Sequence, residues 1–474
     1  MAEDPAGKSV LARLVEIVGA VHVLTADEDK APYLTEWRGY YRGVTPAVVR
    51  PASAAEISAI LELANETGTP IVPQSGNTGL VGGQIPDESG REIVLSLERL
   101  DKVRSVDADG ATIVAEAGVV LERLQEAAER AGMLFPLSLG AQGSCRIGGN
   151  ISTNAGGTQV LAYGNTRSLV LGLEVVLPTG EIWNGLRGLI KDNSGYDLKQ
   201  LFIGAEGTLG IVTAAVLKLF PRPSGQTVAF AAVESPRAAL GLLKHARKLA
   251  GTGLTAFELM PRIAIEMLVK HMPGARDPLA APHPWYVLIE VSSGRGESDA
   301  HELTLRSLAA ALAEGTVADA AIATSVAQAQ DFWRMRHALS EIQKHEGASI
   351  KHDVSVPIER TPDLIRLGSE AVAKAIPGVR PVPFGHLGDG NLHFNFSQPV
   401  GADGKAFLAR APDVHGIVHR IVTEMGGSIA AEHGIGRYKR ELLKGVKSEI
   451  ELEMMRKLKR AFDPNNILNP GRVV

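Results

Sequence analysis

Two short segments of the chain hold side chains that could bind a divalent metal. Residues 385–396 place His386 before a glycine-broken turn, and residues 392–396 then alternate apolar and polar side chains. On a β-strand this alternation puts His393 and Asn395 on one face and the apolar residues on the other. Two imidazoles and a carboxylate from a second segment, such as Glu432, would leave metal positions open for a substrate. The alternative interpretation is hydrogen-bonded histidines beside a glycine-rich turn.

The composition is that of an ordinary soluble globular protein with more than one domain. The chain has 474 residues, of which 45% are hydrophobic and 22% are charged, so we expect two or three domains with their own cores. Lys+Arg 49 against Asp+Glu 53 gives a net charge of −4, without a basic block. This balance argues against nucleic acid as a partner.

Cysteine usage and the first residues bear on location. The single cysteine, Cys145, excludes an internal disulfide framework and a cysteine-only metal site, which fits a reducing compartment. The acidic start differs from a basic presequence, and no apolar run approaches the ~18 residues that span a membrane. We therefore expect a cytoplasmic protein without a transmembrane segment, with peripheral membrane contact left open.

Two glycine-rich segments could bind a ligand through their backbone. In residues 71–83 an apolar strand is followed by a loop with Gly76, Gly79 and Gly82 three apart, a spacing unlike the Rossmann fingerprint. Its backbone N–H groups could turn toward an anion, although this segment by itself is better explained as a plain surface loop. A second run, residues 143–157, is also rich in small residues. Together the two loops suit a large, diphosphate-containing ligand.

The remaining pattern predicts an α+β protein. Ser53, with Glu56 three residues later, is typical of a helix cap, and Pro221 and Pro223 mark a domain boundary. We expect a lead-in over residues 1–41, a first domain over 42–223, a second over 224–430 and a C-terminal segment over 431–474. Predicted helices cover residues 54–66, 121–131, 236–250, 298–314, 331–342, 413–424 and 448–462. Predicted strands cover residues 93–97, 112–117, 170–177, 181–183, 227–233, 285–291 and 349–356.

From residue 44 to residue 471 these motifs resemble one family. Residues 73–79, 147–157, 204–211, 385–395, 432–434 and 467–471 are similar to FAD enzymes of the vanillyl-alcohol-oxidase type. Within that type they resemble the D-2-hydroxyacid dehydrogenases, a branch that includes D-lactate dehydrogenase, the glycolate oxidase flavin subunit and D-2-hydroxyglutarate dehydrogenase. The resemblance implies a two-part FAD-binding domain over 42–223, an α+β substrate domain with a metal site over 224–430, and a helical C-terminal segment that completes the active site.

The resemblance also implies the role of each site residue. His386, His393 and Glu432 would bind the metal, zinc first and manganese or cobalt as alternatives, and His433 would be the general base. Arg336, Ser340, Lys351 and Asn395 would contact the substrate, although on composition alone Arg336 and Lys351 are solvated charges. Non-covalent FAD would be held by Pro73, Ser75, Gly76, Asn77, Thr78, Gly79, Ser144, Gly148, Gly149, Asn150, Thr153, Asn154, Gly156, Gly207, Ile211 and Asn469. Cys145 would have a packing role.

The expected reaction is oxidation of a D-2-hydroxy acid to the 2-oxo acid. A metal would acidify the substrate hydroxyl, His433 would take its proton, and flavin would receive the hydride. Two cations, Arg336 and Lys351, favour a dicarboxylate such as D-2-hydroxyglutarate over D-lactate or glycolate. A flavin-bearing subunit without turnover is a third hypothesis. The sequence leaves open the electron acceptor (an electron-transfer flavoprotein, a quinone or a cytochrome) and the oligomeric state, a homodimer included.

Overall fold

The computed structural model describes residues 9–474, which divide into two units. Unit 1 comprises the chain up to Gly156 together with Asn165–Arg222 and Glu432–Val474, and unit 2 comprises Gly157–Gly164 and Pro223–Ala431. Unit 1 is therefore built from three stretches of sequence. Residues 157–164 lie inside the stretch assigned above to the first domain, but they belong to unit 2.

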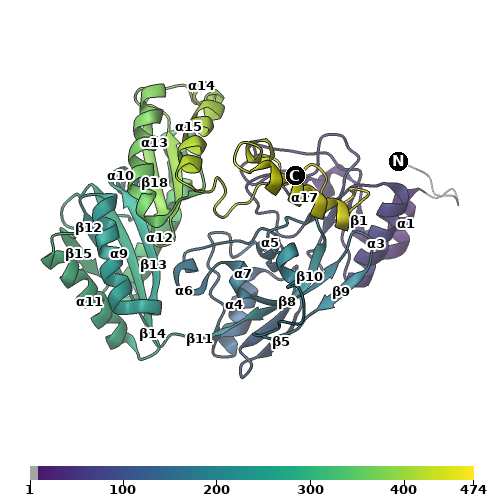
Figure 1. The fold of residues 1–474 in the computed structure, drawn as a ribbon, viewed down its shortest axis with the longest axis horizontal. Helices are drawn as coiled ribbons and strands as arrows, with labels where there is room; N and C mark the ends of the chain where they lie inside the picture. Colours follow the sequence, from purple (N-terminus) through teal and green to yellow (C-terminus); the bar gives the residue numbers. More distant parts are fainter. Residues whose placement is uncertain (1–8) are drawn as a thin grey trace. The chain divides into compact units, whose positions relative to one another are not determined.

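The first part of unit 1 is a small mixed sheet covered by two helices. Its strand order is β1-β2-β4-β3, in which β4 runs parallel to both β2 and β3. Helices α1 (Val10–Val18) and α3 (Ala54–Thr67) pack beside each other on this sheet, around a core that contains Leu14, Ile57 and Leu95 (Figure 1). The strands are β1 (Val23–Leu24), β2 (Val48–Val49), β3 (Ile71–Gln74) and β4 (Ile93–Ser96).

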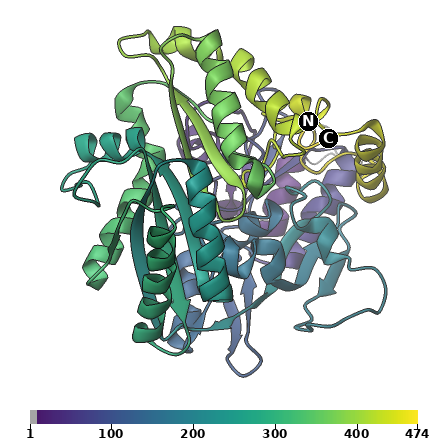
Figure 2. The ribbon, with the colours of Figure 1, turned by 60° about the vertical axis from the view of Figure 1, so that its left-hand side comes forward.

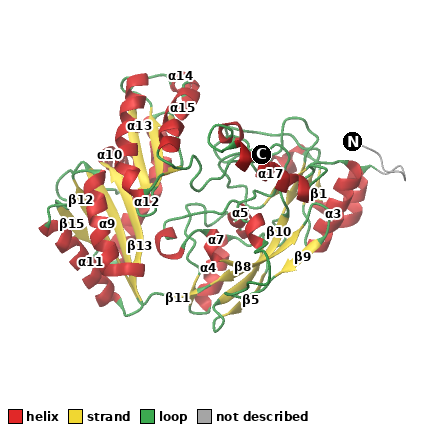
Figure 3. Cartoon of the chain, viewed as in Figure 1, coloured by secondary structure: helices red, strands yellow, loops and turns green. Residues whose placement is uncertain are grey.

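The second part of unit 1 is an antiparallel sheet with the order β5-β6-β10-β8-β9, drawn in yellow in Figure 3. Its central strand β10 is buried along nearly its whole length, and because successive side chains point to opposite faces, both faces of the sheet are covered at this strand. The strands are β5 (Val103–Asp107), β6 (Thr112–Glu116), β8 (Val170–Val176), β9 (Ile182–Gly185) and β10 (Ile211–Lys218). The other elements of unit 1 are α2 (Asp27–Lys30), α4 (Leu121–Arg130), α5 (Ile147–Ser152), α7 (Thr166–Leu169), α8 (Lys199–Phe202), α16 (Arg440–Leu443), α17 (Glu449–Phe462), β7 (Met133–Leu134) and β11 (Phe220–Pro221).

Unit 2 is one antiparallel sheet with helices on both faces. The strand order is β15-β12-β14-β13-β18-β19-β16, and β17 also pairs with β19. Helices α9 (Pro236–Ala250) and α11 (Glu297–Ala313) lie side by side on one face (Figures 1 and 2). The strands are β12 (Gly225–Val233), β13 (Leu254–Pro261), β14 (Trp285–Ser293), β15 (Asp319–Ile322), β16 (Ser349–Ile350), β17 (Val354–Ser355), β18 (Arg380–His386) and β19 (Asn391–Ser397).

Helices α10 (Arg262–His271) and α12 (Val326–Ile342) cover the other face of the β12–β14 region. Phe230, Met260 and Tyr286 of the strands pack with Leu268 and Leu339 of these helices. Because side chains of a strand alternate, Ala229 and Ala231 point away from this core, toward α9 and α11. Helices α13 (Thr361–Ala375) and α15 (Ala411–Glu424) pack against each other beside β18, and α6 (Val160–Tyr163) and α14 (Gly404–Ala409) complete the unit.

The predicted α+β class is confirmed, and so are most of the predicted elements. Helix α9 has the predicted bounds, and Ser53 Oγ accepts a hydrogen bond from Glu56 N at 3.1 Å, as the cap requires. The glycine-rich run 143–157 was expected to be a loop throughout, which is wrong, because residues 147–152 form α5. Among residues 9–474 no helix is both long and apolar enough to cross a bilayer.

The single strand predicted over residues 349–356 is also wrong. It is divided into β16 and β17, which pair with β19 in one continuous register on both sides of the break. Within the break His352 N donates to Asn395 Oδ1 at 3.3 Å, and the His352 ring bonds the Phe394 carbonyl at 2.9 Å. At residues 351–353, hydrogen bonds to side chains thus take the place of the backbone ladder. The alternation of apolar and polar residues in the sequence does not predict such a break.

Candidate functional site

The glycine-rich loops of unit 1 lie in contact with each other. A Cβ atom on Gly76 would lie 2.8 Å from the Ser144 carbonyl oxygen, so the first loop touches the second through backbone. A Cβ on Gly148 would lie 2.7 Å from Ala117 Cβ. Gly207 has a φ of +70°, and its Cβ would lie 2.5 Å from Pro73 Cγ. Three segments predicted to bind the cofactor therefore meet where only glycine leaves room.

Polar side chains in these loops fix the loop shape. Ser75 Oγ donates to Ala117 O at 3.1 Å, and Asn77, with a φ of +52°, donates to Pro32 O at 2.9 Å. Asn154 has a φ of +50°, and its Oδ1 accepts from Arg167 N at 2.9 Å. Because these side chains hold the loop, its backbone N–H groups are the groups suited to hold an anionic cofactor.

The other predicted cofactor residues belong to the same loops or border them. Gln84 Nε2 donates to Gly79 O at 2.9 Å, and Thr153 Oγ1 donates to Gly149 O at 2.9 Å. Asn469 Nδ2 bridges two segments, donating to Gly83 O at 3.0 Å and to Glu206 O at 2.8 Å. Of the remaining four, Thr78 follows Asn77, Asn150 is buried in α5, Gly156 ends the second loop and Ile211 begins β10.

Glu206, within the motif of residues 204–211, holds the C-terminal segment of unit 1 in place. Its carboxylate accepts the backbone N–H of Ile435 at 2.7 Å and of Gly436 at 2.8 Å. Burial raises the pKa of Glu206 to about 6, and these hydrogen bonds oppose that rise. The motif of residues 204–211 includes Glu206, but its partners in the C-terminal segment were not predicted from the sequence.

Glu432 and His433 begin this C-terminal segment of unit 1. A Cβ on Gly156 would lie 2.8 Å from Glu432 Oε1, so the carboxylate lies against the end of the second glycine loop. A Cβ on Gly434 would lie 2.6 Å from Glu206 Oε1, which explains the glycine directly after His433. The predicted metal carboxylate and general base therefore border the predicted cofactor loops.

In unit 2, a buried carboxylate joins a candidate metal ligand to a candidate substrate contact. His386 ends β18, and its Nδ1 lies 2.7 Å from Glu258 Oε1. Arg336 Nε donates to Glu258 Oε2 at 2.7 Å. A carboxylate can only accept, so His386 Nδ1 carries the proton and the lone pair is on Nε2. Metal-binding histidines are commonly oriented by such a second partner, so His386 fits a ligand role.

The Glu258–Arg336 pair is deeply buried. Glu258 is 1% exposed and Arg336 is 5% exposed, so the solvated-charge alternative is wrong for Arg336. Burial by itself would raise the pKa of Glu258, but the charge of Arg336 and the hydrogen bonds from Arg336 and His386 lower it to about 2. Arg336 Nη2 also lies 2.7 Å from the same carboxylate oxygen, and because a guanidinium has five N–H donors, others remain for a substrate carboxylate.

The other predicted substrate contacts gather near the end of α12. Lys351 Nζ donates to the Ser340 carbonyl at 2.8 Å. Asn395 Nδ2 donates to Gln343 Oε1 at 3.2 Å, and its Oδ1 receives the His352 N–H. Ser340 lies one turn after Arg336 on the same helix, as predicted. Unit 2 therefore brings the four residues predicted to bind substrate to one region.

The hairpin β18–β19 carries His393 beside a residue that the sequence analysis missed. The His386 and His393 ring centroids are 5.4 Å apart, and the apolar side chains of β19 are fully buried on its other face, as predicted. A carboxylate oxygen of Asp353 lies within 4.8 Å of a ring nitrogen of His393. Asn391 Nδ2 orients this carboxylate through a hydrogen bond to Oδ1 at 3.0 Å. The only sequence signal for Asp353 was its place two residues after Lys351.

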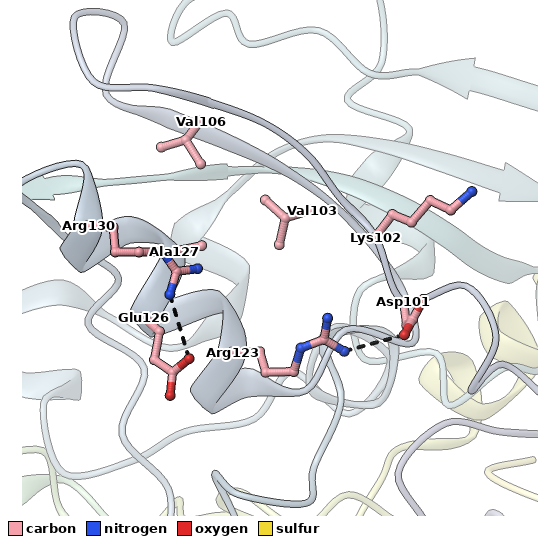
Figure 4. A pocket seen from close by; sticks show the side chains of 8 residues that line it. All are labelled: Asp101, Lys102, Val103, Val106, Arg123, Glu126, Ala127 and Arg130. Atoms are coloured by element: carbon pink, nitrogen blue, oxygen red, sulfur yellow. Dashed lines mark hydrogen bonds and ion pairs between the residues drawn. The ribbon is translucent and has the colours of Figure 1, made fainter.

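A hollow of about 500 Å³ on unit 1 contains none of these residues (Figure 4). It lies between β5 and α4, and its arginines face carboxylates, Arg123 at 3.3 Å from Asp101 and Arg130 at 3.8 Å from Glu126. These paired surface charges give the hollow no group suited to redox chemistry.

Comparison with known proteins places the two halves of the chain in flavoenzyme families. Residues 45–185 match the family described as "FAD binding domain", and residues 222–473 match "FAD linked oxidases, C-terminal domain". The chain is 40% identical to "Probable D-2-hydroxyglutarate dehydrogenase, mitochondrial" of Oryza sativa subsp. indica, over 94% of this chain and 78% of that protein. It is 37% identical to "D-2-hydroxyglutarate dehydrogenase" of Xanthomonas citri pv. viticola, over 97% of this chain and 96% of that protein.

A third relative carries a different name, and solved structures share the fold. "Putative D-lactate dehydrogenase C713.03, mitochondrial" of Schizosaccharomyces pombe is 34% identical, over 98% of this chain and 89% of that protein. Substrate-bound p-cresol methylhydroxylase has a TM-score of 0.77 at 15% identity, with 100% of this chain and 98% of that chain covered. 4-Ethylphenol oxidase from Gulosibacter chungangensis has a TM-score of 0.71 at 18% identity, covering 98% and 96%.

Proposed function

The chain belongs to the FAD-linked oxidases, as an FAD-dependent D-2-hydroxyacid dehydrogenase of the vanillyl-alcohol-oxidase type, and from this premise we propose that it oxidises D-2-hydroxyglutarate. The product would be the 2-oxo acid. The names of the plant and Xanthomonas relatives support this substrate. The observation that carries the proposal is the buried carboxylate of Glu258, which holds a metal-type imidazole and a guanidinium within one unit.

The proposed cofactors fit the residues present. Bound FAD supplies the acceptor for the substrate hydride. The close glycine contacts of unit 1 bring the predicted cofactor loops together, which supports FAD binding there, and Cys145, which is buried, would have a packing role with the flavin bound non-covalently. A bound divalent metal, zinc first, supplies positive charge that lowers the pKa of the substrate hydroxyl. His386, His393 and Glu432 would hold it.

Each remaining residue has one role in this proposal. His433 would take the proton of the substrate hydroxyl, since an imidazole with a pKa of about 6.5 has a neutral form near pH 7. Arg336 would bind one carboxylate through its remaining donor. Lys351 would bind the second carboxylate as a point charge, and Asn395 and Ser340 would hydrogen-bond the substrate. Two cations beside the metal match the two carboxylates of 2-hydroxyglutarate.

The proposal also covers the cellular compartment and the electron acceptor. We place the protein in the cytoplasm, where an electron-transfer flavoprotein, a quinone or a cytochrome would reoxidise the flavin. The names of the Oryza and Arabidopsis thaliana relatives place those proteins in mitochondria.

The test is the visible spectrum of the purified flavoprotein without oxygen. D-2-hydroxyglutarate should bleach the yellow absorbance, its L-isomer should not, and prior chelation should slow the bleaching. His433→Ala should abolish reduction while the protein keeps its flavin. A yellow protein bleached by none of the D-acids would contradict the substrate, and loss of flavin from His433→Ala would contradict the role of His433.

D-Lactate oxidation is the second candidate, favoured by the name of the Schizosaccharomyces pombe relative. Lys351→Ala separates the two substrates, because only a dicarboxylate has a second charge to lose. We expect kcat/KM for D-2-hydroxyglutarate to fall at least tenfold more than kcat/KM for D-lactate. The control is Lys344→Ala, at a lysine 2.7 Å from Glu341 on the surface. Equal losses for both acids would favour D-lactate.

A further inference from the structure

Unit 2 holds a second group of histidines that the proposed reaction does not use. His352 lies in the break between β16 and β17, and His415 and His419 lie one turn apart on α15. One ring nitrogen of each residue lies within 4.8 Å of those of the other two. The spacing His-x-x-x-His on a helix was the available sequence signal, because residues four apart share one face.

The ring orientations suit a common ligand. The rings of His415 and His419 are stacked, with centroids 5.6 Å apart and planes at 11°. The ring of His352 stands edge-on to both, with its centroid 4.7 Å from that of His415 and 5.5 Å from that of His419. His352 and His419 are buried, whereas His415 is half-buried and gives access from solvent.

Hydrogen bonding fixes the tautomer of His352. Its Nδ1 lies 2.9 Å from the Phe394 carbonyl, which can only accept, so Nδ1 carries the proton. Its Nε2 therefore presents a lone pair, and it lies 2.9 Å from His415 Nδ1. An N–H bonded to a backbone carbonyl is the usual outer partner of a metal-binding histidine. His352 is thus prepared as a ligand before any metal arrives.

A cation could replace the proton shared by His352 and His415. At Zn–N distances of about 2.0–2.1 Å, two nitrogens of a tetrahedral site are about 3.4 Å apart. The observed 2.9 Å would need to widen by about half an ångström, which small ring rotations can supply. A metal also allows three neutral imidazoles to lie together, whereas two protonated ones would repel each other.

We propose that His352, His415 and His419 form a second divalent-metal site, of the zinc class, with a fourth position for water. Three imidazole nitrogens suit zinc, copper or nickel better than magnesium or calcium. The site is separate from the one proposed at His386 and His393, and it would bind the broken strand to α15.

The metal would also position the proposed substrate contacts. His352 follows Lys351 directly, and its N–H bonds Asn395 Oδ1, so fixing the His352 ring fixes the backbone of both neighbours. This positioning role depends on the proposed function, whereas metal binding by the three histidines does not.

The test measures zinc per chain in the full-length flavoprotein after saturation with zinc and removal of the excess. Wild type should hold two equivalents, His415→Gln/His419→Gln one, and His393→Ala one. His301→Gln, at an exposed histidine of α11, is the control and should retain two. X-ray absorption of the zinc in His393→Ala should show three imidazole nitrogens, and zinc should raise the Tm of this variant.

The outcomes separate this site from the proposed catalytic metal. One zinc in wild type that survives His415→Gln/His419→Gln and disappears in His393→Ala would overturn the second site. One zinc in wild type that disappears in His415→Gln/His419→Gln and survives in His393→Ala would support the second site and overturn the proposed catalytic metal. If the double variant does not fold, as judged by circular dichroism, the coordination measured in His393→Ala decides, and fewer than three imidazole nitrogens there would overturn the proposal.

Discussion

Unit 1 and unit 2 build their candidate-site residues in opposite ways. Unit 1 uses the absence of side chains, since Gly76, Gly148 and Gly207 touch neighbours so closely that a Cβ would clash. Unit 2 uses buried ionised side chains, with Glu258 between Arg336 and His386. We therefore expect unit 1 to lose stability when a glycine of its loops gains a side chain, and unit 2 to lose stability when a buried charged side chain is replaced by a neutral one.

The largest expected effect is the loss of a charge in unit 2. Arg336→Met leaves Glu258 buried with His386 as its only partner in the network, and breaking a buried pair costs about 3–5 kcal/mol. The matched control is Arg334→Met on the same helix, whose exposed pair with Asp331 is worth at most about 1 kcal/mol. Urea unfolding measures the free energy of unfolding of both variants. Equal losses would show that the buried charge of Arg336 matters no more than an exposed one, which would contradict the difference drawn between the units.

An added atom in unit 1 should have the next largest effect. Gly148→Ala puts a methyl group 2.7 Å from Ala117 Cβ, and overpacking of this kind costs about 1–3 kcal/mol. We also expect weaker flavin binding, measured by titrating FAD into the apoprotein. Gly140→Ala is the control, because its Cβ would meet nothing within 4 Å. Normal FAD affinity in Gly148→Ala would show that the loops tolerate side chains.

Glu206 is a half-buried carboxyl of unit 1 whose raised pKa predicts a pH effect on stability. Its folded pKa of about 6 lies above the ordinary glutamate value of 4.5, so the folded protein binds the proton more tightly than the unfolded chain does. Its contribution to stability is complete below pH 4.5 and falls as the pH rises through 6, by less than about 2 kcal/mol. Glu206→Gln should remove this slope, measured by urea unfolding between pH 4.5 and 7. An unchanged slope would assign the titration to another group.

Helix caps should give the smallest effect, and the same effect in both units. Ser53 caps α3 of unit 1 and Ser235 caps α9 of unit 2, each with its side chain bonded to a backbone N–H at 3.1 Å. Replacing either by alanine should cost about 1 kcal/mol in urea unfolding. A clear difference between the stability losses of Ser53→Ala and Ser235→Ala would mean that the two units also differ in how much their helix caps contribute.

Local patterns in the sequence predicted elements better than they predicted partners. The cap at Ser53 and the bounds of α9 were predicted correctly from capping and periodicity, because each of these signals depends only on residues a few positions apart in the sequence. The site roles came from motif resemblance and stay predictions. Glu258 and the partners of Glu206 were missed because Arg336 is 78 residues from Glu258 and Ile435 is 229 residues from Glu206. Asp353 was missed because the break in its strand depends on side chains of β19.

The break between β16 and β17 also bears on how this protein can change over evolutionary time. The pairing with β19 keeps one register before and after the break, so the backbone ladder is formed by residues on either side of position 351 and not by residue 351 itself. In a continuous strand, each substitution must respect the alternation of buried and exposed faces. Here a new side chain at position 351 could serve a different acid while the fold stays the same. If Lys351 binds the substrate as we propose, the interruption places the residue that selects the acid outside the backbone pairing of the sheet.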